Sequence, residues 1–453
     1  MGKGGTFLVC LLVLICGAPG WAGNVDTYGI GAKATALGGA FSAYADDPFA
    51  IFYNPAGLTQ IARPVVSAGL HIVKPSLRAQ GYRVSGLTPP LALGPRDFLD
   101  HASALVAPHF GFALPISPSL VAGVALYVPY GLDLKWGGTP SDPGAYNSYH
   151  TWYRREVVSP TLAYKATELL SLGAGVSLGR SKAGVDRLAF APALANLQNR
   201  QIETDLEDTM NWSLNLGLLY KPVPAWSFGL AYRGNTKTRF AGTTRAVGLQ
   251  EGDNLGLPGV TVQNTAVHTE TQIDHPEQVQ FGVRYLPRET LSLEVDLVWT
   301  RWSRIDGYRV VFDRKFLDAP LLGPNNPGAS SEFFPRDWQD TKQLRIGVEW
   351  QATKMLALRG SYFYDPTPIP DPTLDLQWAD ADKRTFALGV GLNCGALSLD
   401  SVLQYTVTDG KAEIAGESVN LNNSYRGGGG APQVSLRADG HVWGGGVTMN
   451  YKF

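Results

Sequence analysis

The sequence predicts an all-β protein: a transmembrane antiparallel β-barrel of about fourteen strands with an N-terminal plug in its lumen. Three observations lead to this prediction. Apolar and polar residues alternate in many segments of roughly ten residues. Short turns alternate with long polar loops along the chain, and the chain ends on an aromatic residue, Phe453.

Alternation with a period of two is the basic signal for strands. Apolar residues occupy every second position in 171–178, 278–285, 291–299 and 343–350, and the last segment, 447–453, repeats the pattern. Such a strand places its apolar row against lipid and its polar row in a lumen. The terminal aromatic resembles the signal that the outer-membrane insertion machinery reads, so this machinery is an expected partner during assembly.

The connections between these strands are asymmetric. Short breaks lie at 115–119, 165–168, 221–225, 286–289, 351–354 and 393–395. Long, irregular, mostly polar stretches lie at 74–100, 130–150, 183–208, 241–272, 305–338, 366–382 and 409–439. The breaks join about twelve strands, and the first and last strands raise the number to about fourteen. A soluble β-sandwich also has alternating strands, but it lacks this difference between turns and loops.

Composition narrows the class of protein further. The 453 residues carry a net charge of -1, which gives no reason to expect a nucleic-acid partner. Residues 1–22 read as a signal peptide, with Lys3, an apolar run at 7–16 and cleavage after Ala22. Only Cys394 then remains, so no internal disulfide and no thiolate metal site is expected. No later apolar run reaches about 18 residues, which excludes a helical membrane protein.

Residues 23–62 form a separate unit before the barrel at 63–453. They are rich in glycine and alanine and show no alternation. The apolar cluster at 49–53, followed by Asn54-Pro55-Ala56-Gly57, argues against a disordered tail, which needs low hydrophobicity. We therefore expect a plug folded back into the lumen.

Specific motifs resemble one family over essentially the whole mature chain. Gly38-Gly39-Ala40-Phe41, Ala45-Asp46-Asp47 and Phe52-Tyr53-Asn54-Pro55-Ala56-Gly57-Leu58 resemble the N-terminal hatch of the FadL family. Further matches follow at 129–131, 159–165, 171–175, 337–341 and 359–362. The family consists of outer-membrane transporters for long-chain fatty acids and other hydrophobic compounds, including aromatic hydrocarbons. The resemblance implies a barrel of fourteen strands with a plug.

A possible substrate path lies on the strand at 120–128, which is apolar on both faces. Its inner face carries Val121, Gly123, Ala125 and Tyr127. A strand that is apolar on both faces is buried on both faces. Gly123 permits a kink or bulge, and the resemblance implies that this third strand kinks inward and opens the wall sideways. The alternative is that this face only packs on the plug.

Two further groups of residues are candidates for binding and for the hatch. Asn54, Pro55 and Ala56 suit a rigid hatch corner, because the Asn54 amide can bond to backbone at both ends, although Asn-Pro is also common in simple turns. Arg345 and Arg359 on inner rows, and Arg187 after the fifth strand, could contact a carboxylate headgroup. The alternative for the inner-row pair is a structural ion-pair network with neighbouring carboxylates.

The loop at 183–208 could capture hydrophobic ligands outside the cell. Leu188, Phe190, Leu194 and Leu197 would then form an exposed apolar patch. The alternative is that these four residues cover one another as a small loop core.

Together these features predict a monomeric channel of the Gram-negative outer membrane that takes up hydrophobic compounds, without enzymatic activity and without a cofactor. Its expected partners are membrane lipids and a hydrophobic small molecule. The rival functions are an outer-membrane lipase using His71 or His109, a general porin, and an adhesin. Fatty acids and hydrocarbons both remain possible cargoes, and the exit can be lateral or axial.

Overall fold

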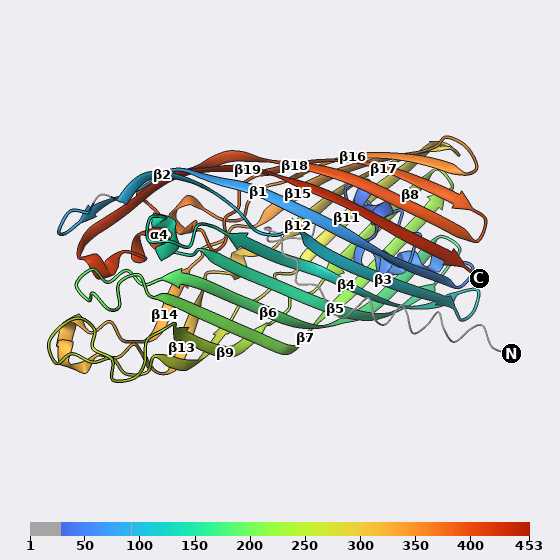
Figure 1. The fold of residues 1–453 in the computed structure, drawn as a ribbon. Helices are drawn as coiled ribbons and strands as arrows, with labels where there is room; N and C mark the ends of the chain where they lie inside the picture. Colours follow the sequence, from blue (N-terminus) through green and yellow to red (C-terminus); the bar gives the residue numbers. More distant parts are fainter. Residues whose placement is uncertain (1–28, 92) are drawn as a thin grey trace, which may run out of the picture.

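A computed structural model describes residues 29–91 and 93–453, so the predicted signal peptide lies outside the described residues (Figure 1). Within these residues the wall is a closed antiparallel barrel of 14 strands, which confirms the predicted fold class. The wall strands are β1 (Val65–Leu87), β3 (Leu105–Pro115), β4 (Leu120–Lys135), β5 (His150–Lys165), β6 (Leu170–Leu188), β7 (Gln201–Val223), β8 (Trp226–Arg233), β11 (Gln278–Arg288), β12 (Leu291–Thr300), β15 (Thr341–Gln351), β16 (Leu356–Asp365), β17 (Lys383–Cys394), β18 (Leu397–Ala415) and β19 (Gly430–Lys452).

The barrel closes where the first wall strand meets the last. β1 pairs with β19 from Val65↔Lys452 to Leu87↔Gly430, and it pairs with β3 on its other side. Along β12 the two rows differ as predicted: Leu297 is 55% exposed, whereas Glu294 is 2% and Asp296 0% exposed. The apolar row therefore faces outward, and the polar row faces the lumen.

Short turns gather at one end of the barrel and long loops at the other (Figure 1). The loop end carries additional elements. They are β2 (Leu93–Leu99), β9 (Arg239–Ala246), β10 (Ala266–Gln272), β13 (Gly307–Phe316), β14 (Ala329–Pro335), α4 (Val419–Asn423), η2 (Pro143–Tyr146), η3 (Trp302–Arg304), η4 (Pro320–Asn325), η5 (Asp371–Thr373) and η6 (Arg426–Gly428). None of the helices in the described part of the chain is long and apolar enough to cross a membrane.

The prediction of irregular loops at 241–272 and 305–338 was wrong in part, because β9, β10, β13 and β14 lie there or extend into them. β9 continues the wall past β8 by pairing with β7, and β10 pairs with β9. The buried row of β10 includes Thr269 and Thr271, so burial alternates along this strand while hydropathy does not. This is why the sequence pattern concealed it.

The N-terminal segment lies inside the barrel, near the end with the short turns (Figure 1). It contains α2 (Ala32–Ala36), α3 (Ala50–Tyr53) and η1 (Pro55–Gln60), and β1 begins at Val65. Its apolar side chains, among them Phe49, Ile51 and Leu58, form one buried cluster with the inner face of β4. We call the described part of this segment, residues 29–60, the plug.

Glycines on the inner rows let the plug backbone touch the wall. A Cβ on Gly229 would lie 2.1 Å from the carbonyl oxygen of Ser42, and one on Gly173 would lie 2.3 Å from the nitrogen of Ala56. Gly282, Gly347 and Gly389 have similarly close plug neighbours. Side chains at these positions would clash with the plug, which explains why the inner rows are rich in glycine.

Replacing Gly229 by valine is expected to loosen the plug without opening the wall, because the plug backbone would have to move. Overpacking of this kind costs about 1–3 kcal/mol, which corresponds to roughly tenfold faster exchange of plug amides. Hydrogen exchange read by mass spectrometry measures this rate. The matched control is Gly360→Val, whose added Cβ meets no atom closer than 3.7 Å. Equal plug exchange in both variants would contradict the close contact.

Candidate functional site

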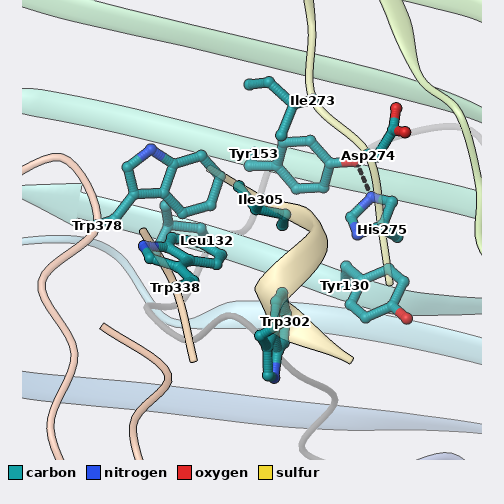
Figure 2. Close-up of a pocket in the computed structure, with 10 residues that line it drawn as sticks. All are labelled: Tyr130, Leu132, Tyr153, Ile273, Asp274, His275, Trp302, Ile305, Trp338 and Trp378. Carbon is teal, nitrogen blue, oxygen red and sulfur yellow. Dashed lines mark hydrogen bonds between the residues drawn. The ribbon is translucent and has the colours of Figure 1, made fainter. Parts of the chain in front are cut away.

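A pocket lined mainly by aromatic side chains (Figure 2) lies where β4 and β5 meet η3 and the loops. Its cavity volume is about 20 Å³, which is room for about one water molecule, so a larger ligand would have to displace lining side chains. Its lining residues are Tyr130, Leu132, Tyr153, Ile273, Asp274, His275, Trp302, Ile305, Trp338 and Trp378. We call it the aromatic pocket.

Segments far apart in the chain supply these side chains. Tyr130 and Leu132 come from β4, Tyr153 from β5, and Trp302 from η3. Residues 273–275 connect β10 to β11, and the backbone of His275 forms an isolated bridge with Thr236. The two remaining tryptophans, Trp338 and Trp378, come from loops. Only the folded barrel brings the ten residues together.

Ring contacts order the side chains around the pocket. Trp338 packs edge-on against Trp302 and Trp378, with centroid distances of 5.2 and 5.8 Å. On the other side of Ile305, Tyr130 stacks on His275 at 4.1 Å, and the Tyr153 hydroxyl hydrogen-bonds to His275 Nε2 (Figure 2). Rings fixed in this way offer a large apolar surface with few mobile side chains.

The strand that carries Tyr130 loses its neighbour in the wall just before the pocket. β3 and β4 pair from Pro115↔Val121 to Phe110↔Leu126, and no further register pair follows among the described residues, although both strands continue. Backbone hydrogen bonding resumes at the loop end, where His101 N–H donates to the Lys135 carbonyl (2.7 Å). We call the stretch between these two points the β3–β4 break.

Two prolines lie where pairing stops. Pro108 and Pro129 have no N–H to donate to a ladder, and both lie within three residues of the last pair. On its other side β4 also shifts register against β5 between Tyr127 and Tyr130, as a bulge does. The side chain of Leu105 reaches across the break to Gly131. If Gly131 carried a Cβ atom, that atom would lie 2.9 Å from Leu105 Cδ1.

The irregularity predicted at Gly123 lies elsewhere. Gly123 is in register with Ala113 on one side and Thr161 on the other, so the strand is regular there. A Cβ at this position would lie 3.0 Å from Ile51 and 3.1 Å from Leu58. Glycine is thus needed for contact with the plug, and the bulge forms at 128–129, where proline removes a donor.

The four residues of the predicted substrate path all face the plug. Val121, Ala125 and Tyr127 are buried in the plug cluster, and Phe52 packs against the Tyr127 ring at 5.5 Å. The Tyr127 hydroxyl also bonds to Ser159 and Ser177. This inner face therefore packs on the plug, and it leads along β4 to the aromatic pocket.

The predicted hatch residues join the plug to the wall. The Asn54 amide nitrogen donates to the carbonyls of Ser42 (2.6 Å) and Leu218 on β7 (2.9 Å), and its oxygen accepts from Ala56 N–H (3.1 Å). Pro55 begins η1, and Ala56 lies against Gly173. The amide thus bonds at both ends, as expected. Its partner in the wall, Leu218, lies in a regular part of β7.

The three arginines proposed to contact a headgroup lie apart from the aromatic pocket. Arg359 pairs with Glu349 (2.6 Å) and Asp400 (2.7 Å), which is the ion-pair network named as the alternative. Arg345 lies beside Gly39 of the plug and donates to Gln343 (2.6 Å). Arg187 pairs with Glu332 at the loop end (2.6 Å).

The loop patch expected at 188–197 is not an exposed surface. Leu188 and Phe190 are buried in the core beneath the loops, and Leu194 and Leu197 are buried in a second core with β9, β10 and β13. The prediction of an exposed apolar patch was wrong, because neighbouring loops supply the cover that one segment of sequence does not show.

Sequence reasoning missed one residue beside the pocket. Arg155 follows the pocket residue Tyr153 on the inner row of β5 and is 3% exposed. Its Nε donates to Asn211 (2.8 Å), while its Nη2 has no hydrogen-bond partner among the described residues. The sequence did contain a signal for this residue. Arg155 is charged, and it lies on the same inner row of β5 as the buried Val157.

Buried polar groups fix the plug against the wall. Glu294 accepts from Ala43 N–H (2.7 Å), Asp296 accepts from Ser42 N–H (3.1 Å), and the Tyr44 hydroxyl donates to Glu349. Among the described residues, no group of three or more His, Cys, Asp and Glu side chains is arranged to hold a metal ion. The described site is therefore built from apolar contacts and hydrogen bonds.

Asp47 is a partly buried carboxyl group of the plug. Its partial burial, followed by the neighbouring Asp46 carboxylate, raises the pKa of Asp47 to about 7. The native plug thus holds this proton more tightly than the unfolded chain, in which the pKa of Asp is about 3.9. The contribution to stability is therefore fully present below about pH 4 and is lost as the pH rises to about 7.

Hydrogen exchange of the plug, corrected for the intrinsic effect of pH, should therefore become faster between about pH 4 and pH 7 in the wild type. Asp47→Asn should remove this dependence, because the amide does not titrate. The plug peptide around residues 46–53 gives the readout, and wall peptides provide the internal control. If the corrected exchange rate of the wild-type plug does not change between about pH 4 and pH 7, ionisation of Asp47 does not destabilise the plug and the prediction is wrong.

Comparison with known proteins agrees with this architecture. The family described as "Outer membrane protein transport protein (OMPP1/FadL/TodX)" matches residues 16–453. A long-chain fatty acid transport protein of Escherichia coli O6:H1 is 23% identical, with 93% of each chain covered. The crystal structure of a Pseudomonas aeruginosa FadL homologue has a TM-score of 0.77 at 19% identity, covering 96% of this chain and 100% of the homologue.

The fold also occurs in the Pseudomonas putida toluene transporter TodX, with a TM-score of 0.66 at 17% identity and coverage of 95% and 100%. At these identities the solved structures show the fold alone, whereas the family match spans nearly the whole chain. This chain belongs to the OMPP1/FadL/TodX family of outer membrane transport proteins.

Proposed function

We propose that this protein is an outer-membrane channel that takes up hydrophobic compounds, binds them in the aromatic pocket and releases them sideways through the β3–β4 break. One observation carries the proposal. Tyr130 and Leu132, which line the pocket, lie on the part of β4 that has no paired neighbour in β3. The pocket and the interrupted wall thus share one strand.

A lateral exit suits an apolar cargo on physical grounds. Keeping apolar surface from water is worth about 25 cal/mol per Å², so the cargo gains by passing from the pocket into lipid without crossing water. The side chains of β3 along the break include Val106, Ala107 and Pro108, which are uncharged. An axial exit would require the plug to leave its buried bonds to β7, β12 and β15.

The rival functions have less support. His71 and His109, which a lipase would use, are 2% and 6% exposed; Phe49 of the plug packs on His109 at 5.0 Å, and His109 bonds to Thr448. A general porin needs an open lumen, whereas the plug contacts the wall on many strands. We infer a monomer that catalyses no reaction and reaches the outer membrane through the insertion machinery, which would read Phe453.

The pocket itself favours an uncharged hydrocarbon, because its lining contains no cation. A second candidate is an amphiphile with a carboxylate, as in the relative named a long-chain fatty acid transport protein. Arg155 supports this candidate, since its buried Nη2 has no partner among the described residues. Charge-assisted hydrogen bonds to a carboxylate would satisfy it.

Restoring the missing N–H donors at the break should reduce uptake. In Pro108→Ala/Pro129→Ala both strands can donate, so we expect the ladder to extend and the uptake of a labelled hydrocarbon to fall several-fold in cells with matched protein levels. Pro160→Ala on β5 is the matched control, because it also replaces a wall proline but lies away from the break. Full uptake by the double variant would exclude this exit.

Substituting Arg155 should separate the two cargo classes. A hydrogen bond to a charged group is worth about 1.5–3 kcal/mol, so Arg155→Gln should weaken the binding of a fatty-acid anion by roughly tenfold or more. The affinity for an alkane of equal chain length should stay within about twofold. Arg187→Gln, which changes a paired cation at the loop end, is the control. Equal losses for both ligands would argue against a headgroup contact.

A further inference from the structure

We propose that the buried ion pair Arg336–Asp375 positions the tryptophans of the aromatic pocket and thereby determines which hydrophobic compounds the protein accepts. The inference rests on the proposed function, because it concerns the selectivity of the same pocket. Neither residue lines the pocket. Both act through the residues that do.

The pair joins two loops that would otherwise be independent. Arg336 Nη1 donates to Asp375 Oδ2 (2.7 Å), and the two side chains are 1% and 0% exposed. Arg336 lies two residues before Trp338, and Asp375 lies three residues before Trp378. A charge pair buried this deeply is costly to break from one side only, because the remaining charge stays out of water.

Asp375 fixes the backbone that carries Trp378. Its second oxygen, Oδ1, accepts from the backbone N–H groups of Gln377 (3.1 Å) and Trp378 (3.0 Å). The loop contains no regular strand or long helix at this point, so these bonds replace the ladder that would otherwise hold it. The position of the Trp378 ring therefore depends on a carboxylate outside the pocket.

Arg336 fixes the other two tryptophans through its backbone and its second nitrogen. The N–H groups of Arg336 and Trp338 donate to Asp306 (2.7 Å) and Ile305 (3.2 Å), in the segment that follows Trp302. Arg336 Nη2 donates to the Tyr308 hydroxyl (2.8 Å). One ion pair thus connects all three segments that supply tryptophans.

The Tyr308 hydroxyl completes the connection. It accepts from Arg336 Nη2 and from Trp378 Nε1 (3.4 Å), and it donates to Gln377 Oε1 (3.2 Å). The Arg336 guanidinium also lies over the Tyr308 ring, with 4.9 Å to its centroid. Tyr308 offers a milder way to disturb the same network, because phenylalanine keeps the ring and removes only the hydroxyl.

The test compares ligand selectivity among purified proteins in detergent. The probes are toluene and naphthalene, which differ by one ring, and quenching of tryptophan fluorescence reports binding. Asp375→Ala should lose about tenfold in affinity for the better wild-type ligand and bring the ratio of the two dissociation constants close to one. Tyr308→Phe should shift the ratio in the same direction by a smaller factor.

Two further variants separate positioning from general stability. Arg336→Gln/Asp375→Asn keeps hydrogen-bonding groups at both positions and should restore most of the wild-type ratio. Arg187→Met/Glu332→Leu removes a different ion pair at the loop end and should leave the ratio unchanged. Heat-modifiable migration on gels confirms that each barrel is assembled.

The outcomes for the two proposals can be distinguished. A wild-type protein that binds neither probe nor a long alkane would refute the proposed function. The positioning role would be overturned by a different result: the wild type binds the probes, and Asp375→Ala assembles but keeps the wild-type ratio of the two dissociation constants. If Asp375→Ala does not assemble, Tyr308→Phe decides, and an unchanged ratio in that variant overturns the proposal.

Discussion

The wall of this barrel depends on one constraint: a backbone N–H or C=O group in hydrocarbon must have a partner. The wall meets this constraint by closing β1 on β19, so that the sheet has no edge in the membrane. The β3–β4 break departs from it. Since unpaired backbone in lipid costs several kcal/mol, such a break persists only where something compensates for it. Here the bulge of β4, the reach of Leu105 and the hydrogen bonds at Lys135 limit the unpaired stretch.

The plug meets a second requirement, which is to fill a barrel too wide for its own side chains. It does so with backbone pressed against glycines and with carboxylates that accept its N–H groups, as Glu294 and Asp296 do. Toward β4 the contact is mainly apolar, through Ile51, Phe52 and Leu58, and a smaller apolar cluster joins Ala32 and Ala36 to β17 and β18. An apolar seam therefore runs up the β4 side of the plug toward the aromatic pocket, while polar bonds hold the plug to β7, β12 and β15.

Properties that repeat along the chain could be predicted from sequence, and those that depend on distant segments could not. Period-two alternation and six short turns were enough for the barrel and its number of strands, and Asn54 was correctly expected to bond at both ends of its amide. The bulge was placed at Gly123, because glycine permits irregularity, whereas β4 shifts register against β5 between Tyr127 and Tyr130, at Pro129. The loop patch was misjudged because the cover over Phe190 comes from Tyr146 and Tyr425. The three tryptophans of the pocket lie 36 to 76 residues apart, so no local pattern could have joined them.

The same route makes different demands on the two candidate cargoes. An uncharged hydrocarbon gains about as much per unit area in the pocket as in lipid, so it can pass between them without a deep trap. A carboxylate bound by Arg155 would have to give up charge-assisted bonds before reaching the uncharged side chains of Val106, Ala107 and Pro108 on β3. Such a cargo could leave only if a proton neutralised it or if water accompanied it. The charge of the cargo, more than its length, therefore decides how readily this wall releases it.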